Sequence, residues 1–154
     1  MGFEFGGPPD VLLFKHAPGV SGTFYVTSDL LFCEHQPKNS LGGYEVAICL
    51  PEEREWAEHI LFKLSHATLE EVFDVGHTAD ITAWVEDTCA IKGLLITELI
   101  SIQFNEQPFG ALLCIGVTRS ELDYALAHGS RKLLRLLEKK TRFPCTDLSR
   151  AAVV

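Results

Sequence analysis

The sequence predicts an α+β domain, a mixed and largely antiparallel sheet flanked by helices. Two observations predict it. Short apolar or alternating segments typical of strands precede a helical pattern, and more such segments precede two further helical patterns near the end of the chain. A regular alternation of strand and helix, which would indicate a parallel sheet, is absent. Since 154 residues is the length of one ordinary domain, we expect a single domain over residues 1–154.

The first half of the chain contains three expected strands and a helical region. Residues 11–14 and 23–27 are predicted as short strands separated by a turn, and residues 44–50 alternate as a strand with one buried face does. Pro51 fits the first turn of a helix whose core stripe is Trp56, Ile60 and Leu64. The T-x-x-E pattern of residues 68–71 predicts a second, short helix ending near Phe73.

The second half begins with strands. Residues 81–85 and 94–104 are predicted as strands, the latter bent or interrupted around Glu98, and residues 105–108 are a polar turn. Residues 111–117 are apolar throughout, which is typical of a central strand covered on both faces.

Two helices and one short strand complete the predicted pattern. The capping box Thr118-x-x-Glu121 begins a helix that stops at Gly129, and a leucine-rich helix follows over residues 130–140. One short strand is expected around residues 146–148.

The charge is acidic overall and unevenly distributed. The net charge is −8, which disfavours binding to nucleic acid or to anionic membranes. Residues 1–130 hold 6 basic and 19 acidic residues, whereas residues 131–154 hold 7 basic and 2 acidic residues. Because the basic residues of the predicted helix over 130–140 lie opposite its leucines, we expect them to form a solvent-exposed helix face rather than a tail that binds a partner.

Targeting signals and cysteine usage indicate a soluble, cytoplasmic protein. The first ten residues lack a signal-peptide pattern, and no uncharged apolar run approaches the roughly 18 residues of a membrane span. The five cysteines form no C-x-x-C pair, and their odd number does not suit a full disulfide set. Cys49 and Cys114 lie in apolar strands, so we expect them to be inert buried thiols.

Motifs for cofactor chemistry are lacking. Neither glycine-rich phosphate-binding motif occurs, so no nucleotide cofactor is expected. His59 and His66 lie seven residues apart, and Cys33-Glu34-His35 lacks a second ligand pair, so no metal site is expected. A G-x-S-x-G nucleophile elbow is also absent.

One loop is a candidate recognition site. The segment FDVGHTADI contains His77, which can change charge near neutral pH, between Asp74 and Asp80, either of which lies close enough in sequence to fix its tautomer. The commoner role of such a histidine is to tie backbone groups together. As a site, we expect Asp74, His77, Thr78 and Asp80 to bind a protein partner.

Several separated motifs resemble the suppressor of fused family. They are GGYEVAICLPEEREW over residues 42–56, FDVGHTADI over 73–81, PFGALLCIGVTRSELDYALAHGSRKLLRLLE over 108–138, and TDLSR over 146–150. The resemblance spans residues 10–150. It implies a mixed α/β domain without enzymatic activity that binds other proteins. In the animal members this domain is joined to a second domain, and the two together bind a peptide, so a role in hedgehog signalling is not inferred for this chain. The Gly76-His77-Thr78 segment resembles the bacterial form of the motif.

Three functional hypotheses remain open. The first is a non-enzymatic, cytoplasmic interaction module, with an immunity protein that binds a basic toxin as one form of it. The second is a small hydrolase centred on His77, with a deep pocket around that residue. The third is assembly with another copy through the apolar edge of an early strand, so we expect a monomer or weak homodimer.

Overall fold

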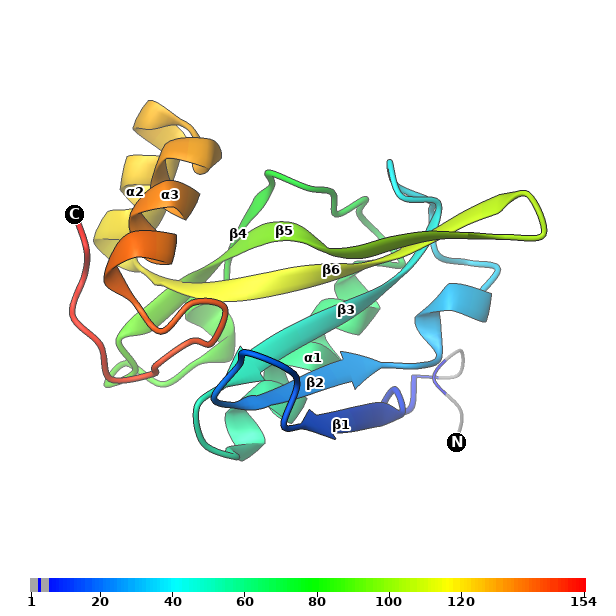
Figure 1. Ribbon diagram of the computed structural model, residues 1–154, viewed down its shortest axis with the longest axis horizontal. Coiled ribbons are helices and arrows are strands. Elements are labelled where there is room, and N and C mark those ends of the chain that lie inside the picture. Colours follow the sequence, from blue (N-terminus) through cyan, green and yellow to red (C-terminus); the bar gives the residue numbers. More distant parts are fainter. Residues whose placement is uncertain (1–2, 4–5) are drawn as a thin grey trace.

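One six-stranded sheet organises the protein, in the order β1-β2-β3-β6-β5-β4 (Figure 1). This computed structural model describes residue 3 and residues 6–154. Four neighbouring strand pairs are antiparallel, and β3 runs parallel to β6. The strands are β1 (Val11–Lys15), β2 (Thr23–Thr27), β3 (Gly43–Leu50), β4 (Thr78–Asp80), β5 (Ile91–Phe104) and β6 (Gln107–Thr118). The predicted mixed, largely antiparallel sheet is confirmed.

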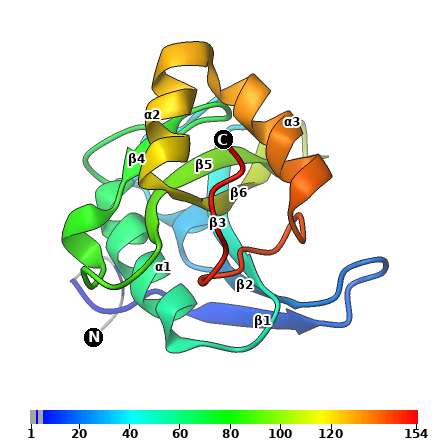
Figure 2. The same ribbon diagram turned by 90° about the vertical axis from the view of Figure 1, so that its left-hand side faces the viewer.

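Helices cover both faces of the sheet. They are α1 (Glu55–Ala67), α2 (Arg119–His128) and α3 (Ser130–Lys140), with the 3-10 turns η2 (Leu30–Phe32) and η3 (Thr82–Trp84). Figure 2 shows α1 on one side of the sheet and the α2–α3 pair on the other. Ile60, Leu61 and Leu64 of α1 pack into one apolar cluster, and Leu133 and Leu137 of α3 pack into a second. Residues 110–118 of β6 are therefore buried between two layers, as the apolar sequence of residues 111–117 predicts.

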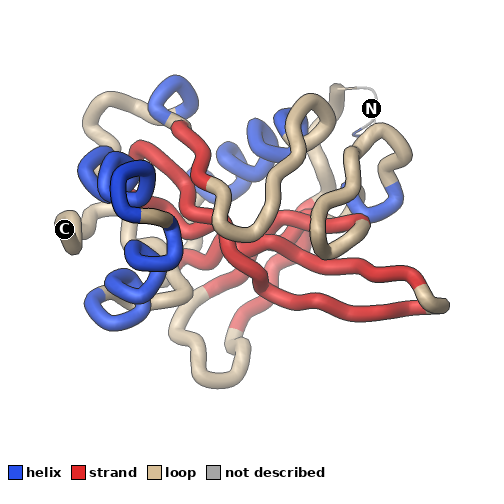
Figure 3. The backbone as a smooth tube through the Cα atoms, turned by 90° about the horizontal axis from the view of Figure 1, so that it is seen from above, coloured by secondary structure: helices blue, strands red, loops and turns tan. Residues whose placement is uncertain are grey.

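The β5–β6 hairpin extends past the helices (Figures 1 and 3). Its register shifts between Glu98 and Ile100, which confirms the predicted interruption in the long strand. Asn105 and Glu106 both have positive φ angles, 49° and 64°, as a two-residue hairpin turn requires. The turn is thus shorter than predicted, because Gln107 and Pro108 already belong to β6.

Three local predictions before β5 are wrong. α1 begins at Glu55 with Arg54 as its N-cap, so Pro51 lies outside the helix. The helix predicted from Thr68 is absent, because the Thr68 hydroxyl donates to the Ser65 carbonyl at the end of α1 and accepts from Gln36. Residues 82–84 form η3 rather than a strand, and the strand lies just before them, over Thr78–Asp80.

The predicted cap of α2 is confirmed. The Thr118 hydroxyl accepts from the Glu121 backbone, and the Glu121 carboxylate accepts from the Thr118 backbone. Gly129, with a φ of 95°, ends α2 and begins α3, a conformation that favours glycine.

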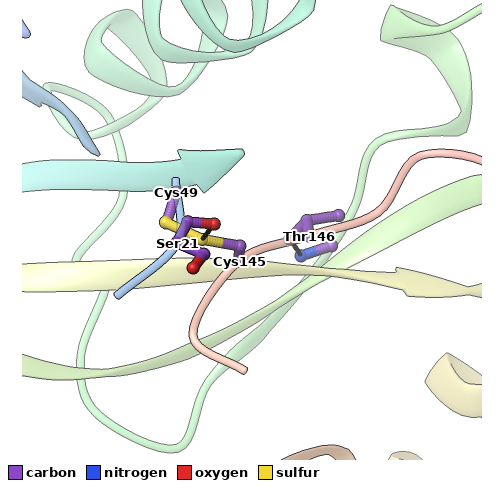
Figure 4. Close-up of a disulfide and its surroundings, with 5 residues drawn as sticks. Ser21, Cys49, Cys145 and Thr146 are labelled. Carbon is purple, nitrogen blue, oxygen red and sulfur yellow. Dashed lines mark hydrogen bonds between the residues drawn. A yellow bond between two sulfur atoms is a disulfide. The ribbon is translucent and has the colours of Figure 1, made fainter. Parts of the chain in front are cut away.

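The segment after α3 crosses the ends of β3 and β6 without forming the predicted strand at 146–148. Thr146 N–H donates to the Cys49 carbonyl (2.8 Å), and Thr146 Oγ1 accepts from Gly116 N–H (2.8 Å). A disulfide joins Cys49 to Cys145 (Figure 4). The expectation that Cys49 is a thiol is therefore wrong. Cys114 is buried, and burial raises its pKa to about 12, as expected for an inert thiol.

A buried ion pair fastens the same segment to α2. The Arg150 guanidinium donates to both carboxylate oxygens of Glu121, at 2.6 and 2.7 Å. Val153 N–H also donates to this carboxylate (2.9 Å). Burial would raise the pKa of Glu121, but these donors outweigh it and hold the pKa below its usual value. Part of the basic C-terminal charge thus folds back onto the acidic body.

Candidate partner-binding site at the β4 edge

The four residues predicted to bind a partner lie along one edge of the sheet. β4 is the last strand in the sheet order and pairs with β5 on one side. Thr78 and Asp80 belong to β4, and Asp74 and His77 lie in the turn that leads into it. The sequence placed all four in a loop. The structure instead places Thr78 and Asp80 on an edge strand.

The hydrogen-bonding pattern leaves the backbone N–H and C=O groups of two β4 residues directed away from the sheet. Ile96 N–H donates to the His77 carbonyl (2.9 Å), and Ile81 N–H donates to the Lys92 carbonyl (3.0 Å). In an antiparallel ladder, alternate residues direct their backbone groups to the same neighbour. Residues 77, 79 and 81 therefore face β5. Thr78 and Asp80 direct their N–H and C=O groups away from the sheet.

The turn before β4 is held from a distant loop. The Ser40 hydroxyl and Ser40 N–H donate to the Asp74 carboxylate at 2.5 and 2.9 Å. Partial burial would raise the pKa of Asp74, but these bonds and one from Val75 N–H outweigh it and lower the pKa. On the far side, the Ser130 hydroxyl donates to the Gly76 carbonyl (2.6 Å). The approach to β4 is therefore fixed in position.

His77 is exposed, and its orientation is set by backbone rather than by a carboxylate. Asp74 N–H donates to His77 Nδ1 at 3.3 Å. A neutral imidazole that accepts at Nδ1 carries its proton on Nε2, so Nε2–H is a donor on the surface. Asp80, the other carboxylate expected to fix this tautomer, binds elsewhere.

Asp80 forms an ion pair at the other end of the strand. The Arg119 guanidinium donates to the Asp80 carboxylate at 2.9 Å and to the Thr82 hydroxyl at 2.6 Å. Hydrogen bonds from Thr82 and Arg119 lower the pKa of Asp80 to about 2. Asp80 is consequently ionised at neutral pH, beside an outward-facing stretch of backbone.

The geometry does not favour the hydrolase hypothesis. That hypothesis requires His77 in a deep pocket with a nucleophile at hydrogen-bond distance. His77 instead accepts from a backbone amide on the surface. A cleft of about 470 Å³ is lined by residues drawn from the segments 50–54 and 142–149, and His77 is not among them. Among the described residues, no three His, Cys, Asp or Glu side chains lie together as a metal site requires.

Ser40 and Arg119 are components of the site that the sequence did not indicate. Ser40 lies 34 residues from Asp74, and Arg119 lies 39 residues from Asp80. No spacing rule connects residues so far apart in the chain.

No helix in the described part of the chain is long and apolar enough to cross a membrane.

Comparison with known proteins identifies the family. The model of the family described as "Suppressor of fused protein (SUFU)" matches residues 7–151, whereas no curated protein matches the sequence significantly. The fold is similar to that in the Sufu–Fu complex crystal structure, with a TM-score of 0.78, 14% identity, and coverage of 99% of this chain and 81% of that one.

Two further crystal structures share the fold. Drosophila Suppressor of Fused has a TM-score of 0.76 and 14% identity, and the match covers 99% of this chain and 45% of that one. A SUFU homolog from Neisseria gonorrhoeae FA 1090 has a TM-score of 0.65 and 21% identity, with coverage of 96% and 80%. The chain thus spans less than half of the Drosophila chain. Since the family model matches nearly the whole sequence, this chain belongs to the suppressor of fused family.

Proposed function

We propose that this chain is a non-enzymatic module that binds a protein partner along β4, through Asp74, His77, Thr78 and Asp80. The observation that carries the proposal is the open edge of β4, where Thr78 and Asp80 direct backbone donors and acceptors outward. An extended segment of another protein pairs with such an edge by adding a strand. One relative with this fold was crystallised in a Sufu–Fu complex, which supports protein binding as the function.

Side chains beside the edge supply specificity. The turn that carries His77 is anchored by Ser40 and Ser130, so its Nε2–H donor is held in a fixed position before the partner arrives. Such preorganisation reduces the entropy lost on binding. At the other end of the strand, Arg119 and Asp80 present a paired cation and anion. The preferred partner segment is therefore extended, with an acceptor placed opposite His77.

The charge of the protein favours a basic partner. The net charge is −8, and the acidic residues are concentrated in residues 1–130. A cationic protein is attracted over a distance by such a field, which accelerates association. We propose an immunity protein that binds a basic toxin as the specific form of this function.

The test is binding to a basic partner protein recovered by co-purification from the native host. Thr78→Pro removes an outward N–H but no bond to β5, and edge strands tolerate proline. We expect this variant to lose at least tenfold in affinity, while Leu13→Pro on the opposite edge of the sheet retains it. The affinity should also fall as salt rises from about 0.05 to 0.5 M.

Two outcomes contradict the proposal. If a partner binds Thr78→Pro as tightly as it binds the unmodified protein, the β4 edge is not the site. If purified protein turns over a small molecule and His77→Ala abolishes that turnover, the module is an enzyme.

A further inference from the structure

The opposite edge of the sheet, β1, is apolar and exposed. β1 has the sequence VLLFK and pairs with β2 on one side. Leu12, Leu13 and Phe14 are 50%, 41% and 51% exposed. An apolar strand at a sheet edge is a template for pairing with another chain unless charges or irregularities protect it.

The one charged residue of β1 does not protect this edge. Lys15 forms an ion pair with Glu53 of the same chain, so its charge is already compensated at the turn between β3 and α1. Proline and a bulge, the other common protections, are absent from the five residues of β1, which pair with β2 in unbroken register. The edge is therefore open to another strand.

The backbone groups that face outward follow from the register. Ser28 N–H donates to the Asp10 carbonyl (3.1 Å), so Asp10 directs its backbone toward β2. Leu12, two residues after Asp10 in the chain, lies opposite Val26 of β2. By the alternation of an antiparallel ladder, Asp10, Leu12 and Phe14 face β2. Val11, Leu13 and Lys15 direct their N–H and C=O groups away from the sheet.

We propose that a second copy of this chain pairs antiparallel along β1, with the two-fold axis at Leu13. In this register Leu13 faces its own symmetry mate, Leu12 faces Phe14, and Val11 faces Lys15. About six backbone hydrogen bonds then form between the copies, two at each outward-facing pair. The two sheets become one continuous sheet.

The sequence of β1 is self-complementary in this register, which favours a second copy over another partner. Apolar side chains meet apolar side chains across the axis, and no two like charges lie opposite each other. An isologous interface requires such complementarity of a surface with itself.

The dimer is weak, because the contact is small. Two strands of five residues bury less than the roughly 1,200 Å² of total surface typical of stable interfaces. The association is therefore concentration-dependent. It is also independent of partner binding, since β1 and β4 are the two opposite edges of the same sheet.

Sedimentation velocity over a wide range of protein concentration, combined with amide hydrogen exchange, tests this inference. We expect the mass to rise from monomer toward dimer, and the amides of Val11, Leu13 and Lys15 to exchange more slowly at the highest concentration. The amides of Leu12 and Phe14, already bonded to β2, should change little. A monomer at every concentration overturns the proposal.

Variants locate the interface. Leu13→Pro removes the outward N–H at the axis, and Leu13→Lys places two like charges there without requiring a change in backbone conformation. Both are expected to remain monomeric, whereas Thr78→Pro and Leu126→Lys, which removes an exposed leucine of α2, should dimerise like the unmodified protein. A dimer that persists in Leu13→Lys overturns the proposal, whatever the fate of the proline variant.

Discussion

The ion pair between Arg150 and Glu121 gives the sharpest prediction about stability. Glu121 is fully buried, and its carboxylate receives hydrogen bonds from Arg150, Thr118 and Val153. Arg150→Met keeps the length of the side chain but leaves the buried carboxylate without its counter-charge. Breaking one side of a buried pair costs about 3–5 kcal/mol. We expect a loss of that size, a large part of the total stability of a typical domain.

The loss depends on pH in a defined direction. In the intact protein the pKa of Glu121 is lowered, so the pair stabilises the fold above the unfolded pKa and this contribution is lost as pH falls through the folded pKa. Without Arg150, burial raises the pKa of Glu121. The difference in stability between the variant and the unmodified protein is thus largest near neutral pH and shrinks toward pH 4.

Urea unfolding followed by the fluorescence of Trp56 and Trp84 measures this effect. Glu121→Gln and the double variant complete a mutant cycle, in which we expect a coupling energy of about 1–3 kcal/mol. The control is Arg54→Met, since Arg54 pairs with Glu52 on the surface, where a pair contributes at most about 1 kcal/mol. A loss below about 1 kcal/mol for Arg150→Met, with no pH dependence, would refute the reasoning.

Three further changes test other features. Cys145→Ala opens a disulfide that closes a loop of 96 residues, for which chain entropy predicts a loss of about 4–5 kcal/mol. Reductant should cause a similar loss in the unmodified protein, and no change would contradict this. Gly42→Ala places a Cβ against the backbone of β6 at a position where φ is 96°. It should lower the free energy of unfolding by more than Gly76→Ala, which costs roughly 1 kcal/mol because its Cβ meets open space. Equal losses of stability in the two variants would argue against a steric cause. Asp80→Asn removes an exposed pair with Arg119 and should change stability by less than about 1 kcal/mol; a larger loss in urea unfolding would show that the pair is structural.

Local sequence signals predicted the elements whose hydrogen bonds are local. The capping box of α2 connects Thr118 and Glu121, three residues apart, and it forms as predicted. The similar pattern at Thr68 failed because a neighbouring helix and a distant glutamine use the same hydroxyl. A strand of three residues, such as β4, is too short to show alternation. It is recognised through its pairing with β5.

The candidate site shows the same limit. His77 and Asp74 are three residues apart and were predicted to interact, and they do form a contact, but it uses the Asp74 backbone N–H rather than the predicted carboxylate. The residues that hold this turn, Ser40 and Ser130, come from other parts of the chain. Likewise, the disulfide joins cysteines that are 96 residues apart, and the composition argument against a full disulfide set does not exclude one bridge.

Amide hydrogen exchange along β4, with and without a bound partner, tests the proposed function most directly. Strand addition predicts that the Thr78 and Asp80 amides, which face away from β5, become strongly protected in the complex. The Ala79 amide, which faces β5, should change much less. If the complex is fully formed and the Thr78 and Asp80 amides still exchange at the same rates as in the free protein, binding at this edge is contradicted.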